Sequence, residues 1–436
     1  MKKTGACILA GTLMTAVVFA ADWPQFCGPK RNNISTETGL ARSWPAAGPE
    51  VLWTINVTSG YASPVVKDGK VYLMDYDGTN SILRVLELDS GKELWTVSFA
   101  DSGTPMNKLY PGTRGTPSVT DDSIYAATLF GTMICVDLDS RKIKWKRQLV
   151  KEFGAKAGAS GFAQSPLVHG DLVIVAPLSK ASSVVALDKR TGTDVWRTPG
   201  FGGSTAFVSP SIISVDGEDQ VLMVAPAEAA GSPARSSDDD ETGGKEPRTT
   251  YVFAVSPKDG KVLWTYLGWS CTKPIPGPIQ VGSNTLFITS GYQSISAMIK
   301  VEKTDKGYEA KELFKTENAA TSVSQPVFVN NCLFVSGTSK AAGKGLVCID
   351  LDGNTKWDAG ALKLTCLNMI AVDGMLVGLD SKSGMLHLIE ATPKAFNKLA
   401  SAKVLDEAGQ ALAPIALSDG KLLVRDHKVM KCLNLK

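Results

Sequence analysis

Short apolar runs separated by Gly, Asp and Asn make up nearly all of the chain beyond residue 50. In the clearest unit, Pro64 opens apolar runs at 64–66, 70–74 and 82–88, and a last run contains Trp95. Gly and Asp lie between the runs because hairpin turns need residues that tolerate a positive φ. The pattern therefore predicts four short antiparallel β-strands in each unit.

This unit recurs eight times along the chain, at intervals of 43 to 68 residues. A repeat of roughly this length that holds four strands is typical of one blade of a β-propeller. We therefore expect an all-β fold, an eight-bladed β-propeller of four-stranded antiparallel blades. Aligned on the residue that opens the first strand, the units begin at Pro64, Pro117, Pro166, Pro210, Pro278, Pro326, Met369 and Pro414.

The eighth unit predicts how the ring closes. It has apolar runs near 421–425 and 429–435, and it ends without a fourth strand that holds a Trp. Residues 51–53 form an isolated apolar strand with a Trp before the first unit. We expect this N-terminal strand to complete the last blade, because closure removes the exposed strand edges that invite aggregation. Residues 51–436 are then a single propeller, preceded by an N-terminal extension at 21–50.

The first 20 residues are typical of an export signal. Lys2 and Lys3 precede an apolar stretch at 8–19, and small residues follow up to Ala20. We expect cleavage after Ala20 and a periplasmic or secreted protein. No later apolar run reaches the roughly 18 residues that a membrane-spanning helix needs, so we expect no transmembrane segment.

Charge and histidine content argue against several classes of function. The formal net charge of +3 gives no basic surface of the kind that binds nucleic acid. His169, His387 and His427 are isolated in the sequence, whereas a zinc site needs several ligands at recognisable spacing. No local pattern indicates a Ser-His-Asp triad. We therefore expect no catalytic residue, no metal site and no nucleic-acid partner, and we expect a monomer.

A Trp in the last strand of most units is predicted to pack between neighbouring blades and to donate its N–H to a carbonyl. These blade-docking residues are Trp53, Trp95, Trp145, Trp196, Trp264 and Trp357.

Cysteines divide into two groups by position. Cys135, Cys348 and Cys432 occupy one repeat position that Ala186 and Ala254 fill in other units, so we expect buried core thiols there. The second group lies outside the predicted core strands, where a disulfide is compatible with an oxidising compartment and the pairing stays open. It consists of Cys27, Cys271 and Cys366.

One interval is longer than the others because of an insertion at 226–248. The insertion is rich in Gly, Ser and Asp and cannot supply a core, so it predicts a surface loop.

The repeat resembles that of a known family. The segment 184–196, Val-Val-Ala-Leu-Asp-Lys-Arg-Thr-Gly-Thr-Asp-Val-Trp, resembles the Ala-x-Asp, Thr-Gly and Trp pattern of pyrroloquinoline-quinone (PQQ) repeat propellers, and segments 88–95 and 259–264 repeat its second half. The sequence Asp-Trp-Pro-Gln-Phe-Cys-Gly-Pro at 22–29 resembles the Trp-Pro-Gln-x-Arg-Gly-Pro opening of exported PQQ-like proteins of planctomycete-type bacteria, with Cys27 in place of the Arg.

The resemblance covers nearly all of the predicted mature chain and implies the fold, but it is compatible with several functions. The superfamily includes quinoprotein dehydrogenases, the propeller lipoprotein of outer-membrane barrel assembly, and sensor domains. A quinoprotein of this family holds PQQ between a Trp and a disulfide of two adjacent cysteines, with Ca²⁺ on carboxylate and amide oxygens and an Asp as base. No two cysteines are adjacent here.

We therefore expect a non-catalytic exported propeller that binds a protein or cell-envelope partner and takes no cofactor. The alternative is a quinoprotein that oxidises an alcohol or sugar with PQQ and Ca²⁺.

The loops that join one blade to the next converge on one face, at the mouth of the central channel. Three of them, at 98–115, 146–164 and 265–276, are long. Polar and aromatic side chains in or beside such loops are candidates for contact with an anionic or peptide-like partner. The candidate binding residues are Tyr61, Arg114, Gln164, Trp269, Lys273 and Gln325.

Overall fold

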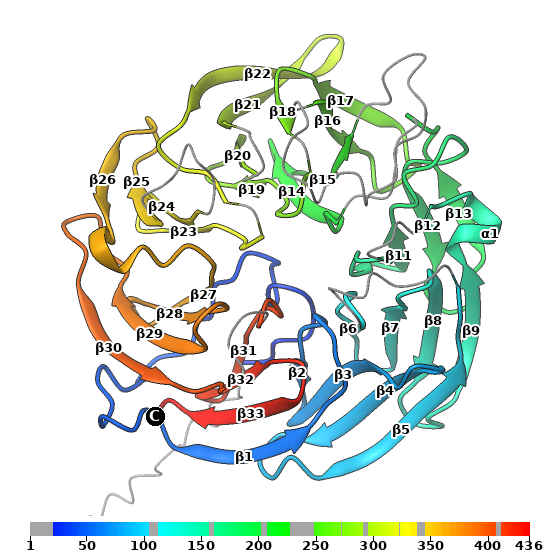
Figure 1. The fold of residues 1–436 in the computed structure, drawn as a ribbon. Coiled ribbons are helices and arrows are strands. Elements are labelled where there is room, and N and C mark those ends of the chain that lie inside the picture. The colour runs from blue at the N-terminus through cyan, green and yellow to red at the C-terminus, as the bar shows by residue number, and fades with distance from the viewer. Residues whose placement is uncertain are drawn as a thin grey trace, which may run out of the picture.

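Eight antiparallel sheets surround a central axis in the computed structural model, and each sheet is one blade of a propeller (Figure 1). The structure describes residues 21–103, 112–156, 161–201, 207–226, 248–271, 273–290, 295–321, 323–337, 345–406 and 411–436. The predicted export signal at 1–20 and most of the predicted insertion at 226–248 lie outside these residues. Across the described ranges, no helix has the length and apolarity needed to span a membrane.

The first four blades follow the chain in order, from the innermost strand to the outermost. Blade 1 comprises β2 (Val65–Lys67), β3 (Lys70–Tyr76), β4 (Asn80–Glu87) and β5 (Glu93–Ala100). Blade 2 comprises β6 (Ser118–Val119), β7 (Ser123–Ala127), β8 (Thr132–Asp137) and β9 (Ile143–Gln148), followed by the short helix α1 (Leu149–Phe153). Blade 3 comprises β10 (Leu167–His169), β11 (Leu172–Val175), β12 (Val185–Asp188) and β13 (Asp194–Arg197). Blade 4 comprises β14 (Ser211–Val215), β15 (Glu218–Pro226), β16 (Arg248–Val255) and β17 (Val262–Tyr266), and β18 (Ser270–Cys271) pairs with β16.

The other four blades complete the ring. Blade 5 comprises β19 (Ile279–Gln280), β20 (Thr285–Ile288), β21 (Ser296–Thr304) and β22 (Gly307–Thr316). Blade 6 comprises β23 (Val327–Val329), β24 (Cys332–Ser336), β25 (Leu346–Ile349) and β26 (Thr355–Asp358), before a 3₁₀ turn at Gly360–Leu362. Blade 7 comprises β27 (Leu367–Val372), β28 (Met375–Asp380), β29 (Met385–Glu390) and β30 (Lys398–Lys403). Blade 8 comprises β31 (Ala416–Ser418), β32 (Lys421–Arg425), β33 (Val429–Asn434) and β1 (Val51–Asn56).

The predicted closure of the ring is confirmed. Strand β1 lies antiparallel to β33, with Trp53 opposite Cys432, so the N-terminal strand is the outermost strand of blade 8. The predicted start of each unit is also confirmed, because each opening Pro lies one or two residues before an innermost strand. Met369, the aligned exception, lies within β27.

Tryptophans of four outer strands donate a hydrogen bond to the next blade. The indole N–H of Trp53 in blade 8 donates to Leu88 O of blade 1 at 2.8 Å, and Trp145 of blade 2 donates to Lys189 O of blade 3 at 3.1 Å. Trp196 and Trp357 make the same kind of bond to the carbonyls of Pro257 and Thr392. Trp264 instead donates to the side chain of Gln220 in its own blade at 2.7 Å.

The glycine four residues before a blade's Trp receives the Trp of the preceding blade. A Cβ added at Gly91 would lie 2.7 Å from the Trp53 ring, and Gly192 and Gly260 face Trp145 and Trp196 in the same way. In blade 2 this position is Arg141, with a φ of 58°, and its guanidinium lies 5.9 Å from the centre of the Trp95 ring. Trp95 is half-buried, because an Arg side chain replaces the close backbone contact.

A Cys or Ala lies opposite five of the six blade-docking tryptophans, and Val85 lies opposite Trp95. Cys135, Cys348 and Cys432 are the direct cross-strand partners of Trp145, Trp357 and Trp53, and Ala186 and Ala254 face Trp196 and Trp264. All three cysteines are free thiols and are fully buried. The prediction of buried core thiols is therefore confirmed, and burial raises the pKa of Cys135 to about 11 and that of Cys432 to about 12.

Cys27, Cys271 and Cys366, for which a disulfide was an open alternative, are also buried free thiols in the structure. None of the three is paired with another.

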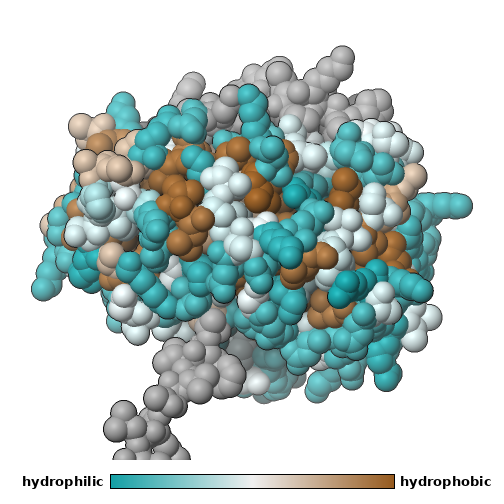
Figure 2. Space-filling view, turned by 90° about the horizontal axis from the view of Figure 1, so that it is seen from below, coloured by the Kyte–Doolittle hydropathy of each residue, from teal (hydrophilic) through white to brown (hydrophobic). Residues whose placement is uncertain are grey.

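The outer surface of the ring follows from strand alternation. In β1, β5 and β13 the residue before the Trp points outward, so Leu52, Leu94 and Val195 are 36–51% exposed. Figure 2 shows such apolar side chains on the side of the disc in small groups separated by polar ones.

A buried ion pair ties the closing blade to the first blade. Arg425 of β32 and Asp75 of β3 are each 1% exposed, and Arg425 Nη1 lies 3.7 Å from Asp75 Oδ1. Arg425 Nη2 donates to Thr58 O at 2.6 Å, and Asp75 accepts from Thr58 Oγ1 at 2.8 Å. Arg84 of β4 is a second cation, 3.2 Å from Asp75. Because Thr58 lies two residues after β1, these contacts hold the closing strand, β32 and blade 1 together.

We predict that Gly91→Ala destabilises the protein more than Gly69→Ala. The two glycines have φ values of 69° and 68°, but a Cβ at Gly91 would meet Trp53 whereas one at Gly69 has nothing within 4 Å. Gly69→Ala should lower the free energy of unfolding by about 1 kcal/mol through its backbone conformation. Gly91→Ala should lower it by about 1–3 kcal/mol more through overpacking. Equal losses in chemical denaturation would show that the Trp–Gly contact does not hold the blades together.

We also predict that Asp75→Ala lowers the free energy of unfolding by about 3–5 kcal/mol, because it removes the anionic partner of the fully buried Arg425. The matched variant is Asp89→Ala, whose carboxylate is 78% exposed and lies 3.0 Å from Lys421. Its loss should be below about 1 kcal/mol. Equilibrium unfolding in urea measures both values, and a small loss for Asp75→Ala would contradict the role given to this pair.

Candidate binding site in the central channel

A belt of hydrogen bonds around the channel fixes the innermost strands. In three of these bonds, a backbone N–H donates to the hydroxyl of the residue just before the opening Pro of the next blade. Ser63 N–H donates to Thr116 Oγ1 (3.1 Å), Thr116 N–H to Ser165 Oγ (3.0 Å) and Ser165 N–H to Ser209 Oγ (2.9 Å). Ser63 Oγ donates to Pro414 O at 2.8 Å, which links blade 1 back to blade 8. The Ser or Thr before the opening Pro of blades 1 to 4 therefore has a structural role.

In six blades, the residue three positions before the opening Pro of the first strand faces a common cavity. The cavity has a volume of about 320 Å³ and lies in the centre of the ring. These equivalent positions are Tyr61, Arg114, Ala163, Phe207, Ile275 and Val323. The other lining residues are Phe26, Cys27, Asn33, Ser209, Lys273, Pro276, Gln325, Asn368, Met369, Leu412, Pro414 and Ile415.

One side of the cavity carries two cations held against aromatic rings. The Arg114 guanidinium lies 4.8 Å from the centre of the Tyr61 ring, and Lys273 Nζ lies 4.6 Å from the centre of the Phe207 ring. Such cation–π contacts hold a cation in a defined orientation. The described residues that line the cavity include these two cations and no Asp or Glu.

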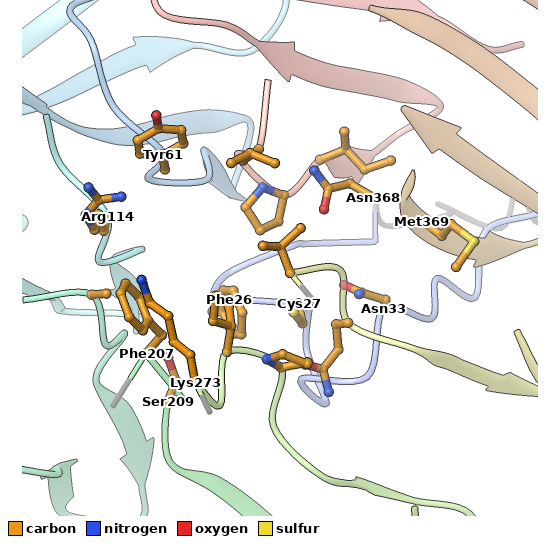
Figure 3. Close-up of a pocket in the computed structure, with 18 residues that line it drawn as sticks. Phe26, Cys27, Asn33, Tyr61, Arg114, Phe207, Ser209, Lys273, Asn368 and Met369 are labelled. Carbon is orange, nitrogen blue, oxygen red and sulfur yellow. The ribbon is translucent and has the colours of Figure 1, made fainter. Parts of the chain in front are cut away.

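The opposite side is largely aliphatic. Val323, Met369, Leu412 and Ile415 belong to blades 6, 7 and 8 and their connections. Figure 3 shows Arg114, Phe207 and Lys273 on one side of the cavity, with Asn368 and Met369 across from them. The cavity is thus amphipathic across its width.

The floor of the cavity comes from the N-terminal extension. Backbone bonds join Trp23 to Val66 in β2 in both directions, at 2.8 and 2.9 Å. Further on, Ser35 N–H donates to Ala371 O and Ala371 N–H donates to Asn33 O, both at 2.9 Å. The segment therefore crosses the ring from blade 1 to blade 7 (Figure 1), and Phe26, which it carries, faces the cavity (Figure 3).

Arg31 anchors this crossing segment to the innermost strands. Its guanidinium donates to the carbonyl of Pro210 at 2.8 Å, to that of Pro166, and to Ser118 Oγ at 3.4 Å. The side chain is buried, and burial lowers the pKa of Arg31 to about 10. One charged group from residue 31 thus contacts blades 2, 3 and 4.

The crossing segment adopts an unusual backbone conformation. Cys27, Arg31 and Asn33 have φ values of 59°, 53° and 57°, a region that non-glycine residues rarely occupy. Gly28, with a φ of 82°, lies against the Trp23 ring, where a Cβ would approach to 2.8 Å. Such strain persists only where the surrounding contacts over-determine the conformation.

Cys27 lines the cavity but is not a reactive thiol. Its side chain is 1% exposed, and burial raises its pKa to about 12, with the Arg31 charge acting in the opposite direction. The thiol is therefore protonated at neutral pH.

A second cavity of about 650 Å³ lies beside the same segment, against the innermost strands of blades 4, 5 and 6. Phe26, Ser209, Ile275 and Gln325 line both cavities. The crossing segment therefore divides the channel in two.

The structure brings four of the six predicted binding residues to the first cavity: Tyr61, Arg114, Lys273 and Gln325. The Gln325 amide also holds the neighbouring blade, because it accepts from Gly277 N–H at 3.0 Å and donates to Gly277 O at 2.8 Å.

The other two predicted residues lie elsewhere. Gln164 is 2% exposed, and the aligned position in its blade is Ala163, one residue earlier. Trp269 is 1% exposed in the core of blade 4, where its indole N–H donates to Ile295 O at 2.6 Å. The pairing of β18 with β16 draws this Trp inward from its loop.

Sequence reasoning missed Phe26, Cys27 and Asn33, because it assigned no role to the extension. It placed Phe207 just before a first strand but did not select it as a binding residue, although its ring lies against Lys273. A constant offset of three residues before each opening Pro would have found Phe207, since Tyr61 and Arg114 occupy the same offset.

His427 is the histidine that lies next to the cavity residue Tyr61. His427 lies edge-on to Tyr61 with ring centres 4.9 Å apart, and its Nδ1 accepts from Gly60 N–H at 3.2 Å. Burial, then the nearby Arg425, lowers the pKa of His427. No group of three His, Cys, Asp or Glu side chains suited to a metal occurs in the part of the chain that the structure describes.

The described lining does not fit the PQQ centre of a quinoprotein, the alternative function considered from the sequence. The described lining residues include no Trp and no carboxylate, and Cys27 is their single cysteine. Ca²⁺ takes six to eight oxygen ligands, commonly including carboxylates, whereas this cavity presents two cations. The described part of the lining therefore does not supply the Trp, the cysteine pair or the carboxylates of such a centre.

Comparison with known proteins agrees with the repeat. Residues 79–266 match the family model described as outer membrane protein assembly factor BamB. The repeat in these residues is therefore PQQ-like, within an eight-bladed β-propeller. The serine/threonine-protein kinase AfsK of Streptomyces griseus is 31% identical to this propeller over 173 residues, and BamB of Yersinia pestis is 26% identical over 135 residues. These matches cover 37% and 29% of the propeller's chain, and only 19% and 33% of the two relatives' lengths.

Solved structures share the fold at low sequence identity. BamB from Moraxella catarrhalis is similar with a TM-score of 0.58 and 15% identity, over 89% of the propeller's chain and 98% of its own. The quinohemoprotein alcohol dehydrogenase from Comamonas testosteroni gives 0.62 and 14%, over 95% and 80%. At these identities the likeness concerns the fold alone.

We predict that Arg31→Gln makes Cys27 accessible to iodoacetamide. The substitution removes the charge that anchors the crossing segment, so the segment should open. Loss of the positive charge alone would raise the pKa of the Cys27 thiol and slow the reaction, so faster labelling cannot come from that electrostatic effect. A rise in labelling of Cys27 of about tenfold or more therefore reports opening of the floor, since burial controls thiol reactivity. Peptide mass spectrometry at pH 8 measures the rate.

Two internal references accompany this measurement. Cys135, in the core of blade 2, should remain unlabelled in the same sample, and Arg190→Gln, with a side chain that is 74% exposed, should leave Cys27 protected. Continued protection of Cys27 in Arg31→Gln would contradict the anchoring role of Arg31.

Proposed function

We propose that the protein is an exported, non-catalytic propeller that binds a protein or cell-envelope partner through its inter-blade loop face. The observation that carries the proposal is the set of two cations, Arg114 and Lys273, each against an aromatic ring, around a cavity with no acidic residue in its described lining. A site of one charge sign attracts a partner of the opposite sign and disfavours partners of like charge. The partner therefore presents a negatively charged group at the mouth of the channel.

The arrangement of the site favours binding over chemistry. Its titratable groups are held in cation–π contacts or buried, and the raised pKa of Cys27 removes a candidate nucleophile. Rigid blades that present side chains from connecting loops are typical of recognition sites.

The comparisons support an envelope location. One relative is named as a factor in outer membrane protein assembly, and the export signal predicted at 1–20 is consistent with transport across a membrane. The kinase match, which covers 19% of that protein, supports the repeat and not a kinase activity.

Capture from an envelope extract tests the proposal. Immobilised wild-type protein should retain a partner that is lost, by about tenfold or more, with Arg114→Ala plus Lys273→Ala, since each loses a charge-assisted contact. The matched control is Arg190→Ala plus Lys258→Ala, which removes two exposed cations from the turns on the opposite face of the ring. This control should retain the partner.

Two results would contradict the proposal. Equal capture by both double variants would remove the loop face from the interface. A stoichiometric quinone spectrum after addition of PQQ and Ca²⁺ to the purified protein, with dye-linked alcohol oxidation, would support the alternative of a quinoprotein.

A further inference from the structure

We propose that the central cavity is a site for a carboxylate joined directly to an apolar group. This inference rests on the proposed function, because it names the chemistry that enters the same site. It follows from how charge, apolar surface and closure are distributed around the cavity.

The cationic side selects a carboxylate. Arg114 comes from the connection between blades 1 and 2 and Lys273 from the connection between blades 4 and 5, so the two charges approach the cavity from separate parts of the ring. The rings of Tyr61 and Phe207 hold them in place. A guanidinium matches the planar fork of a carboxylate, and an ammonium acts as a second point charge beside it.

The aliphatic side requires an apolar body on the same ligand. Val323, Leu412 and Ile415 cannot satisfy a polar group, and burying one there without a partner is unfavourable. The side-chain N–H groups of Asn368, on the same side, already donate to the carbonyls of Ala411 and Ala413. Because both sides bound one cavity, the charge and the apolar group must lie within a few atoms of each other. A side-chain carboxylate of Asp or Glu offers too little apolar surface for this role.

The volume agrees with a ligand of this size. A cavity of about 150 Å³ accommodates benzene, so 320 Å³ accommodates an aromatic or branched aliphatic group together with a carboxylate. The crossing segment with Phe26 forms the floor, so the ligand does not pass through the ring as an extended chain.

Two sources share this chemistry. One is the C-terminal residue of a protein, where the carboxylate and an apolar side chain share one Cα, and the other is a free aliphatic or aromatic carboxylic acid. The experiment below distinguishes them.

Isothermal titration uses three probes with the full-length protein: acetyl-Ala-Ala-Phe as the free acid, the same peptide as the C-terminal amide, and 3-phenylpropionate. We expect the acid peptide to bind and the amide to bind about tenfold or more weakly, the effect of losing a charge-assisted hydrogen bond. Tighter binding of the peptide acid than of 3-phenylpropionate assigns the site to protein C-termini. The reverse order assigns it to free organic acids.

Three variants locate the binding. Arg114→Gln and Lys273→Gln should each weaken binding of the preferred acid by about tenfold. Leu412→Asp places a like charge on the aliphatic side and should abolish binding, while Arg190→Ala plus Lys258→Ala should leave it unchanged. Thermal unfolding without ligand shows that each variant is folded.

The proposal is overturned if neither acid binds the folded wild-type protein, or if binding is the same in Arg114→Gln and Lys273→Gln. In that event, continued loss of the envelope partner with Arg114→Ala plus Lys273→Ala would leave the proposed function intact and reject only the apolar carboxylate.

Discussion

The pairing of β1 with β33 is the interaction on which the rest of the structure depends. It converts a row of eight sheets into a ring, and only a ring brings the inner ends of all blades around one axis. The same pairing fixes residue 51, so the extension that precedes it must approach from blade 8. Closure and the floor of the cavity are therefore built by one continuous segment, which crosses the channel and then becomes the outermost strand of the last blade.

The fold could be predicted because its determinants are local. The turn glycines, the opening prolines and the outer tryptophans recur within each unit, and the missing strand of the eighth unit was matched by the spare strand at 51–53. The structure adds reasons for details that the pattern left unexplained. A Cys or Ala occurs opposite the buried blade-docking tryptophans because the cross-strand space is small. Trp95, which is less buried, lies opposite Val85, and Arg141 replaces the turn Gly beside it.

The candidate site was predictable only in part. Tyr61 and Arg114 are marked by their place before the first strand, whereas Gln164 is one residue out of the aligned position. The floor left no recognisable pattern, because Arg31 bonds to backbone carbonyls more than 130 residues away and any residue supplies a carbonyl. Trp269 lies in the core since β18 pairs with β16, a strand pair that the repeat does not contain. The chemistry of the cavity thus arises where equivalent positions of the repeat carry different residues.

The central claim is that a ligand binds above the crossing segment, between the cationic and aliphatic sides. A crystal structure with 3-(4-bromophenyl)propionate, measured at the bromine absorption edge, tests it most directly. The account predicts an anomalous peak beside Leu412 and Met369, with the carboxylate at Arg114 and Lys273. A peak in the second cavity, on the other side of Phe26, or no peak in either cavity would contradict it.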